Sequence, residues 1–234
     1  MTAATGAAGR HRVRVSRDPA LPDHLVVWPT GGVRRGVSVD GRPDDGASPD
    51  DADACEVIDH RISSPFSFAE LVSEIRSDDP DAVVAAVYPS TTSTSVEDDW
   101  IELARVAAGD DEDSTRRVFT GDTTPTSLRA LRRWVSIHAT AAPQALDDLI
   151  LATSELATNV ERHARGWLTV DLAEVGDRLV VAVTDPAVDR FPEPRSVAAD
   201  QVSGRGLLVV AAVSELWGVV ARPTSKTVWA ALSR

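Results

Sequence analysis

The chain is poor in cysteine, since Cys55 is the only one among 234 residues. No disulfide can therefore form within the chain, and a reducing compartment is the expectation. The sequence also lacks an apolar run near the ~20 residues that a membrane-spanning helix needs. Residues 1–17 lack the apolar core of a secretory signal. We therefore expect a cytoplasmic protein without membrane contact.

Basic side chains are scarce too, but only in the first half of the chain. Residues 1–114 carry 23 acidic and 10 basic side chains, whereas residues 115–234 carry 13 acidic and 14 basic ones. Binding to nucleic acid requires a basic footprint, so this balance predicts no nucleic-acid partner. Solubility and an acidic docking surface both explain the acidic excess, and solubility is the simpler explanation.

The charge difference divides the chain into two predicted domains, residues 1–114 and 115–234, with the acidic run 109–114 as a linker. The first domain is predicted to be a small α/β unit of unknown role. We expect a disordered start at 1–10, a loop at 36–54, strands at 12–15, 24–28, 55–62 and 82–88, and helices at 67–76 and 96–108. The second domain is expected to fold without the first.

Three polar residues of the second domain, Glu155, Asn159 and His163, recur every four positions. This spacing places them on one face of a helix. A neighbouring stripe of the helix is largely apolar and suited to a core; its members are Leu146, Ile150, Thr153, Leu156 and Val160. A carboxylate with an amide one turn away can orient a hydroxyl and hold a metal ion. A solvated helix face is the alternative explanation.

Turn residues delimit the other elements of the second domain. We expect a helix beginning at Thr124-Pro125, strands at 167–174 and 178–185 joined by Gly176-Asp177, and a final hairpin of 218–222 and 226–232. The second of these strands ends on Asp185. Gly204 and Gly206 then open an apolar run, and glycines at a helix start let backbone N–H groups approach a phosphate.

The order of these features resembles the GHKL ATPase superfamily, and more closely its anti-sigma factor serine/threonine kinase branch. The resemblance covers about residues 116–234. The matching positions are Glu155, Leu156, Asn159, His163 and Ala164 in a first box, Asp185 in a second, Gly204 and Gly206 in a third, and residues 226–230 as the last strand. The resemblance implies a Bergerat-type ATP-binding α/β sandwich, with a mixed, mainly antiparallel sheet and helices on one face.

The resemblance also implies roles for the polar residues of the first two boxes. Asn159 would help to coordinate Mg²⁺ that bridges the phosphates of ATP, and Glu155 would be the general base that activates the attacking hydroxyl. Magnesium prefers hard oxygen ligands, which agrees with this pair. Asp185 would accept a hydrogen bond from the adenine amino group. Thr227 would support that contact directly or through water.

Further roles concern the phosphates. The resemblance implies that Gly204 and Gly206 let the loop close on them, with Arg205 as a charge partner. His163 would contact a phosphate, although a histidine near a helix C-terminus is equally explained by the helix dipole. The chain departs from the family at Ala187, where the family has glycine, so the backbone there loses glycine-only conformations and nucleotide affinity could be modest.

Three functions remain open from the sequence. The first is an ATP-dependent protein serine/threonine kinase that acts on an anti-sigma antagonist and also holds a sigma factor. The second is a non-catalytic module whose partner affinity changes with ATP, and the third is an interaction protein whose site has decayed. The presence of both Glu155 and Asn159 favours the kinase, because binding alone needs no base. A homodimer is expected from the family alone.

Overall fold

The computed structural model describes residues 24–28, 56–57, 68–78, 80–89, 100–109, 115–164, 166–192 and 205–234. The predictions for residues 1–10, 12–15, 36–54 and 110–114, and for Gly204, lie outside these ranges. Within them, no helix is both long and apolar enough to cross a bilayer.

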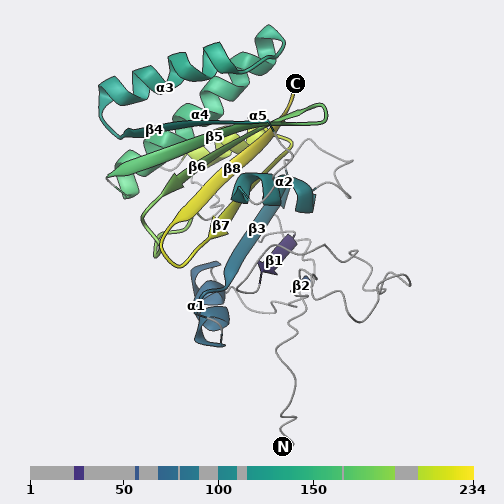
Figure 1. Ribbon diagram of the computed structural model, residues 1–234, viewed down its shortest axis with the longest axis vertical. Helices are drawn as coiled ribbons and strands as arrows, with labels where there is room; N and C mark the ends of the chain where they lie inside the picture. The colour runs from purple at the N-terminus through teal and green to yellow at the C-terminus, as the bar shows by residue number, and fades with distance from the viewer. Residues whose placement is uncertain are drawn as a thin grey trace, which may run out of the picture.

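The strands of the described residues form one eight-stranded sheet (Figure 1). Its order is β2-β1-β3-β7-β8-β6-β5-β4, and each pairing of neighbours is antiparallel. The strands are β1 (His24–Trp28), β2 (Glu56–Val57), β3 (Val83–Pro89), β4 (Arg116–Asp122), β5 (Trp167–Val175), β6 (Arg178–Asp185), β7 (Leu216–Ala221) and β8 (Lys226–Ser233). Both predicted hairpins of the second half are confirmed, and Gly176 in the β5–β6 turn has φ of 57°.

Helices cover both faces of the sheet (Figure 1). They are α1 (Phe68–Asp78), α2 (Trp100–Ala108), α3 (Pro125–His138), α4 (Pro143–His163) and α5 (Gly206–Val213). Alternate residues of a strand point to opposite faces. Val181 and Val183 of β6 accordingly belong to the buried cluster that includes residues of α1, α3, α4 and α5, whereas Val180 and Ala182 belong to the cluster that includes α2.

The α/β sandwich expected for residues 115–234 is confirmed, with α3, α4 and α5 on one face of the sheet. The described pairings are all antiparallel, where a mixed sheet was expected. From the first half of the chain, α2 covers the opposite face. The reason is the composition of the second face: Ala182, Val220 and Trp229 are buried there, and apolar residues on both faces of a strand need cover on both sides.

The predicted boundary at residue 114 does not correspond to a break in the sheet. Strand β3, from the first half, pairs with β7 from Val84↔Ala221 to Pro89↔Leu216. Phe68 of α1 also packs edge-on against Phe191, in the loop after β6, with ring centroids 4.9 Å apart. The two halves therefore share one sheet, and each of its two buried faces contains residues of both halves.

The start of α3 follows the predicted cap. The Thr124 hydroxyl accepts a hydrogen bond from the Ser127 backbone N–H, and Pro125 is the first helical residue. The Thr124 hydroxyl and backbone N–H both donate to Asp122, which lowers the pKa of that carboxyl. These bonds tie the end of β4 to the first turn of α3.

Candidate functional site

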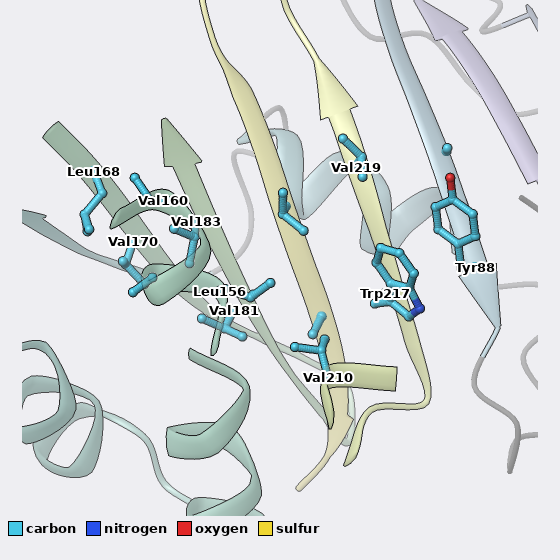
Figure 2. Packing of buried hydrophobic residues seen from close by; sticks show 14 of the residues in the cluster. Tyr88, Leu156, Val160, Leu168, Val170, Val181, Val183, Val210, Trp217 and Val219 are labelled. Atoms are coloured by element: carbon cyan, nitrogen blue, oxygen red, sulfur yellow. The ribbon is translucent and has the colours of Figure 1, made fainter. Parts of the chain in front are cut away.

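The packing of α4 fixes the direction of its polar face. Its buried residues are Leu149, Ala152, Thr153, Leu156, Ala157 and Val160, whereas Leu146 and Ile150 of the predicted stripe are half-buried. Figure 2 shows Leu156 and Val160 beside Val181 and Val183 of β6, with Val210 of α5 nearby. This packing leaves Glu155 and Asn159 half-buried beside the core, as the helical spacing predicts.

The first residue of α5 brings a third group to this pair. Gly206 is buried, and a Cβ atom on it would stand 2.7 Å from Glu155 Oε2 and 3.5 Å from Asn159 Oδ1. Residues 155, 159 and 206 therefore meet where α4 passes the start of α5. Any side chain at residue 206 would have to displace the Glu155 carboxylate.

We expect Gly206→Ala to slow any reaction that depends on Glu155 by about tenfold, because misplacing a catalytic group is costly. The added methyl group would push the carboxylate aside, while alanine itself favours the helix. The rate of ATP turnover measures the effect. Leu208→Ala, at a 47 % exposed position of the same helix, is the control. An unchanged rate in Gly206→Ala would contradict the expectation that the reaction depends on where the Glu155 carboxylate lies.

Arg205 and His163 lie at helix ends near this pair. Arg205 is the exposed N-cap residue of α5, and its carbonyl accepts from the Val209 backbone N–H at 3.0 Å. The first turn of a helix leaves N–H groups without intrahelical partners, which suits an anion. His163 is the exposed last residue of α4, and its carbonyl accepts from Arg190 Nη1 at 3.2 Å. A phosphate contact for either side chain stays a prediction.

Asp185 ends β6 as predicted, but one oxygen of its carboxylate, Oδ1, is already engaged. The Nζ atom of Lys226 lies 2.6 Å from Asp185 Oδ1, and the two residues are 4 % and 2 % exposed. The same oxygen accepts from the backbone N–H of Ala187 at 2.8 Å, and Lys226 Nζ also donates to the Ala187 carbonyl at 3.0 Å. Ala187 is thus held by the ion pair at both of its backbone groups.

Thr227 does not lie beside Asp185. In the β6–β8 register Asp185 is opposite Lys226, and Thr184 is opposite Thr227. Because neighbouring residues of a strand point to opposite faces, the Thr227 hydroxyl is on the face that α2 covers. There it lies 2.8 Å from the Thr184 hydroxyl and accepts from Arg222 Nη1 at 3.3 Å. The structure therefore does not bring Thr227 to the position that the sequence resemblance implied.

Lys226 is the site residue that was not predicted from the sequence. One signal was available, since Lys226 is the only lysine among 24 basic residues of the chain. Arginine cannot replace a compact ammonium group in every buried site, because its guanidinium is larger and carries five donors in a fixed plane. A single lysine in an arginine-rich chain, directly before Thr227, indicated that this position requires an ammonium group.

Comparison with known protein families supports the resemblance that the order of the motifs suggested. Residues 121–232 match the family model of the histidine kinase-like ATPase domain. The match supports a GHKL-type domain over this range, and a domain of this type implies ATP binding. Its boundaries enclose Glu155, Asn159, Asp185 and Gly206. A search of curated proteins found no match to the chain.

The predicted site residues of the ATPase-type domain differ in how well they suit the binding of a nucleotide. On the phosphate side, Gly206 keeps the space beside Glu155 and Asn159 open, and these two side chains supply the oxygen ligands that magnesium prefers. On the base side, Asp185 Oδ1 already accepts from Lys226 and from Ala187. The residues at the start of α5 therefore fit Mg-ATP, whereas at Asp185 one of the two carboxylate oxygens is already engaged.

Proposed function

We propose that the protein binds Mg-ATP through its ATPase-type domain and transfers the γ-phosphate to a serine or threonine of a partner protein. The partner class that we propose is an anti-sigma antagonist, with a sigma factor as a second binding partner and a homodimer as the working form. The observation that supports the proposal is the meeting of Glu155, Asn159 and Gly206 at the start of α5.

Each of these residues has one task in the proposed reaction. The Glu155 carboxylate accepts the proton of the attacking hydroxyl as the new oxygen–phosphorus bond forms and the bond to the leaving ADP oxygen breaks. The Asn159 side-chain oxygen would hold magnesium, which would neutralise charge at the phosphates. Gly206 lets the helix start approach the phosphates closely. Phosphoryl transfer depends mainly on such positioning and charge stabilisation.

A second candidate is a non-catalytic module whose affinity for its partner changes with the bound nucleotide. The buried ion pair of Asp185 and Lys226 favours it, because a base subsite whose carboxylate already has one oxygen engaged predicts weaker nucleotide binding. The two candidates differ in turnover. The kinase transfers phosphate, whereas the module binds and releases ATP unchanged.

The test of the proposed nucleotide site is Asn159→Ala. We expect wild-type protein to bind ATP about tenfold more tightly with magnesium than without it, and the variant to lose this difference. Isothermal titration with and without magnesium measures both affinities. Gln144→Ala, which removes an exposed amide near the other end of α4, is the control. Equal magnesium dependence in wild type and Asn159→Ala would exclude Asn159 as the metal ligand.

A further inference from the structure

We propose that Lys226 recognises the base of the nucleotide together with Asp185. The Lys226 ammonium group would donate a hydrogen bond to N1 of adenine, while the second carboxylate oxygen of Asp185, Oδ2, accepts from the adenine amino group. This inference rests on the nucleotide site proposed above. It assigns a specificity-determining role to a residue for which the sequence resemblance implied none, and it gives that residue the supporting contact expected of Thr227.

Lys226 lies where a second contact to the base is needed. In the β6–β8 register Asp185 is paired with Lys226, and Thr227 is the next residue of β8, so its side chain points to the opposite face. The Lys226 Nζ atom lies 2.6 Å from Asp185 Oδ1 and donates to the Ala187 carbonyl at 3.0 Å. The ammonium group is therefore beside the carboxylate that would bind adenine, whereas the Thr227 hydroxyl is not.

The ion pair leaves one acceptor and one donor unused. Lys226 and Ala187 both donate to Oδ1, and no residue within the described ranges donates to Oδ2. An ammonium group has three N–H donors. Asp185 and Ala187 accept from two of them, and no described residue accepts from the third. Asp185 and Lys226 are only 2 % and 4 % exposed, and polar groups so enclosed normally have a partner. A bound ligand can supply both missing partners.

The unused acceptor and donor are complementary to one edge of adenine. Adenine presents its amino group, a donor, next to the ring nitrogen N1, an acceptor. Guanine presents the reverse order on this edge, with O6 as the acceptor and N1–H as the donor. In the same orientation, guanine would direct O6 at the carboxylate oxygen and N1–H at the ammonium group, so neither hydrogen bond could form. Buried polar groups left unpaired in this way discriminate strongly between ligands.

The ion pair also fixes the direction of Oδ2. Two donors hold Oδ1, the Lys226 ammonium group and the Ala187 backbone N–H, so rotation of the carboxylate would break both hydrogen bonds. A group that is already oriented loses little conformational freedom when a ligand binds. Lys226 thus acts on the base in two ways, through its own third N–H donor and through the orientation of Oδ2.

Analogues of ATP that lack one contact each provide the test. In 1-deaza-ATP a C–H group replaces N1, and in 7-deaza-ATP the same change is made away from this edge of the base. Their magnesium complexes are titrated into the full chain by calorimetry. We expect wild-type protein to bind Mg-1-deaza-ATP about tenfold more weakly than Mg-ATP, because one hydrogen bond to a charged group is lost. Affinity for Mg-7-deaza-ATP is expected to stay within roughly threefold of that for Mg-ATP.

Two variants assign the effect to Lys226. Lys226→Met keeps the length of the side chain without its donors, and we expect it to bind Mg-ATP and Mg-1-deaza-ATP equally, because N1 then has no donor to lose. Arg178→Met is the control. It removes a different cation that faces a carboxylate, since Arg178 Nε lies 2.8 Å from Glu215 Oε2 at the other end of β6. The tenfold difference between the two nucleotides is expected to persist in Arg178→Met.

The single lysine allows a measurement that needs no variant. Protein labelled with ¹⁵N at the lysine Nζ atom has one side-chain ammonium signal, from Lys226. We expect Mg-ATP to shift this signal more than Mg-1-deaza-ATP or Mg-tripolyphosphate does, because only Mg-ATP offers N1 to the ammonium group. Equal shifts with the three ligands would overturn the inference, whether or not Lys226→Met folds.

The outcomes separate this inference from the proposed function. Wild-type protein that binds Mg-ATP and Mg-1-deaza-ATP equally would overturn the inference and leave the proposed nucleotide site standing. A tenfold difference that persists in Lys226→Met would also overturn it, because another group would then be the donor to N1. If wild-type protein binds none of these ligands, the proposed nucleotide site fails, and the inference fails with it. A difference present in wild type and absent in Lys226→Met alone would support the inference.

Discussion

Glu155→Gln is expected to slow phosphoryl transfer by about 10²–10⁴ while affinity for Mg-ATP changes by no more than several-fold. Glutamine keeps the size of the side chain and its place beside Gly206, but the amide cannot accept the proton of the attacking hydroxyl. Because the carboxylate acts on that hydroxyl, its loss affects the transition state far more than the bound nucleotide. Single-turnover transfer to a candidate antagonist, and titration with Mg-ATP, measure the two quantities separately.

A matched control lies on the same helix. Glu161→Gln removes an exposed carboxylate from α4 and is expected to leave both quantities unchanged. Equal transfer rates for Glu155→Gln and wild type would contradict the role of Glu155 as general base. If wild-type protein neither hydrolyses ATP nor phosphorylates any candidate, the non-catalytic module becomes the better description of the chain.

The fragment 115–234 is expected to be less stable than the full chain by at least ~5 kcal/mol, and therefore to unfold or aggregate. This expectation reverses the one drawn from charge and linker composition. Removing the first half deletes α2, which covers Val180, Ala182 and Trp229, and leaves the edge of β7 without its partner β3. Each large apolar side chain that regains contact with water costs about 1.5–3 kcal/mol. Thermal unfolding and analytical ultracentrifugation of the fragment measure the outcome.

A point substitution in the full chain tests the same contact. Leu103 of α2 is fully buried on the second face, and Leu103→Ala is expected to cost about 2–5 kcal/mol of unfolding free energy. Leu151→Ala, at a 41 % exposed position of α4, is expected to change stability by no more than ~0.5 kcal/mol. A soluble fragment that unfolds cooperatively at the temperature of the full chain would instead support a domain boundary at residue 114.

Local signals in the sequence were sufficient for most of the second half. Helical spacing placed Glu155 and Asn159 beside the buried face of α4, and Gly176-Asp177 predicted the β5–β6 turn. The Thr124-Pro125 pair marked the start of α3. These features depend on interactions between residues a few positions apart, so a sequence displays them directly.

One strand of the second half had no such signal. Residues 116–122 form β4, the edge strand beside β5, but most of this strand is exposed. Of its residues, only Phe119 packs against the buried cluster on the face covered by α3 and α4, near Trp134 of α3. A strand with little to bury lacks the alternation of apolar and polar residues that predicts a strand, so pairing with β5 decides its conformation.

By itself, the sequence determined the order of the nucleotide motifs, the polar face of α4 and the turns that make the hairpins. Only the tertiary structure decided that α2 covers the second face of the sheet and that Asp185 Oδ1 is paired with Lys226. The β6–β8 register also directed Thr227 away from that pair. The physical reason is that a shift of one residue between two strands exchanges the faces of all their side chains. In the β6–β8 register, the paired residues Asp185 and Lys226 are 41 positions apart in the sequence, so local sequence signals do not display this register.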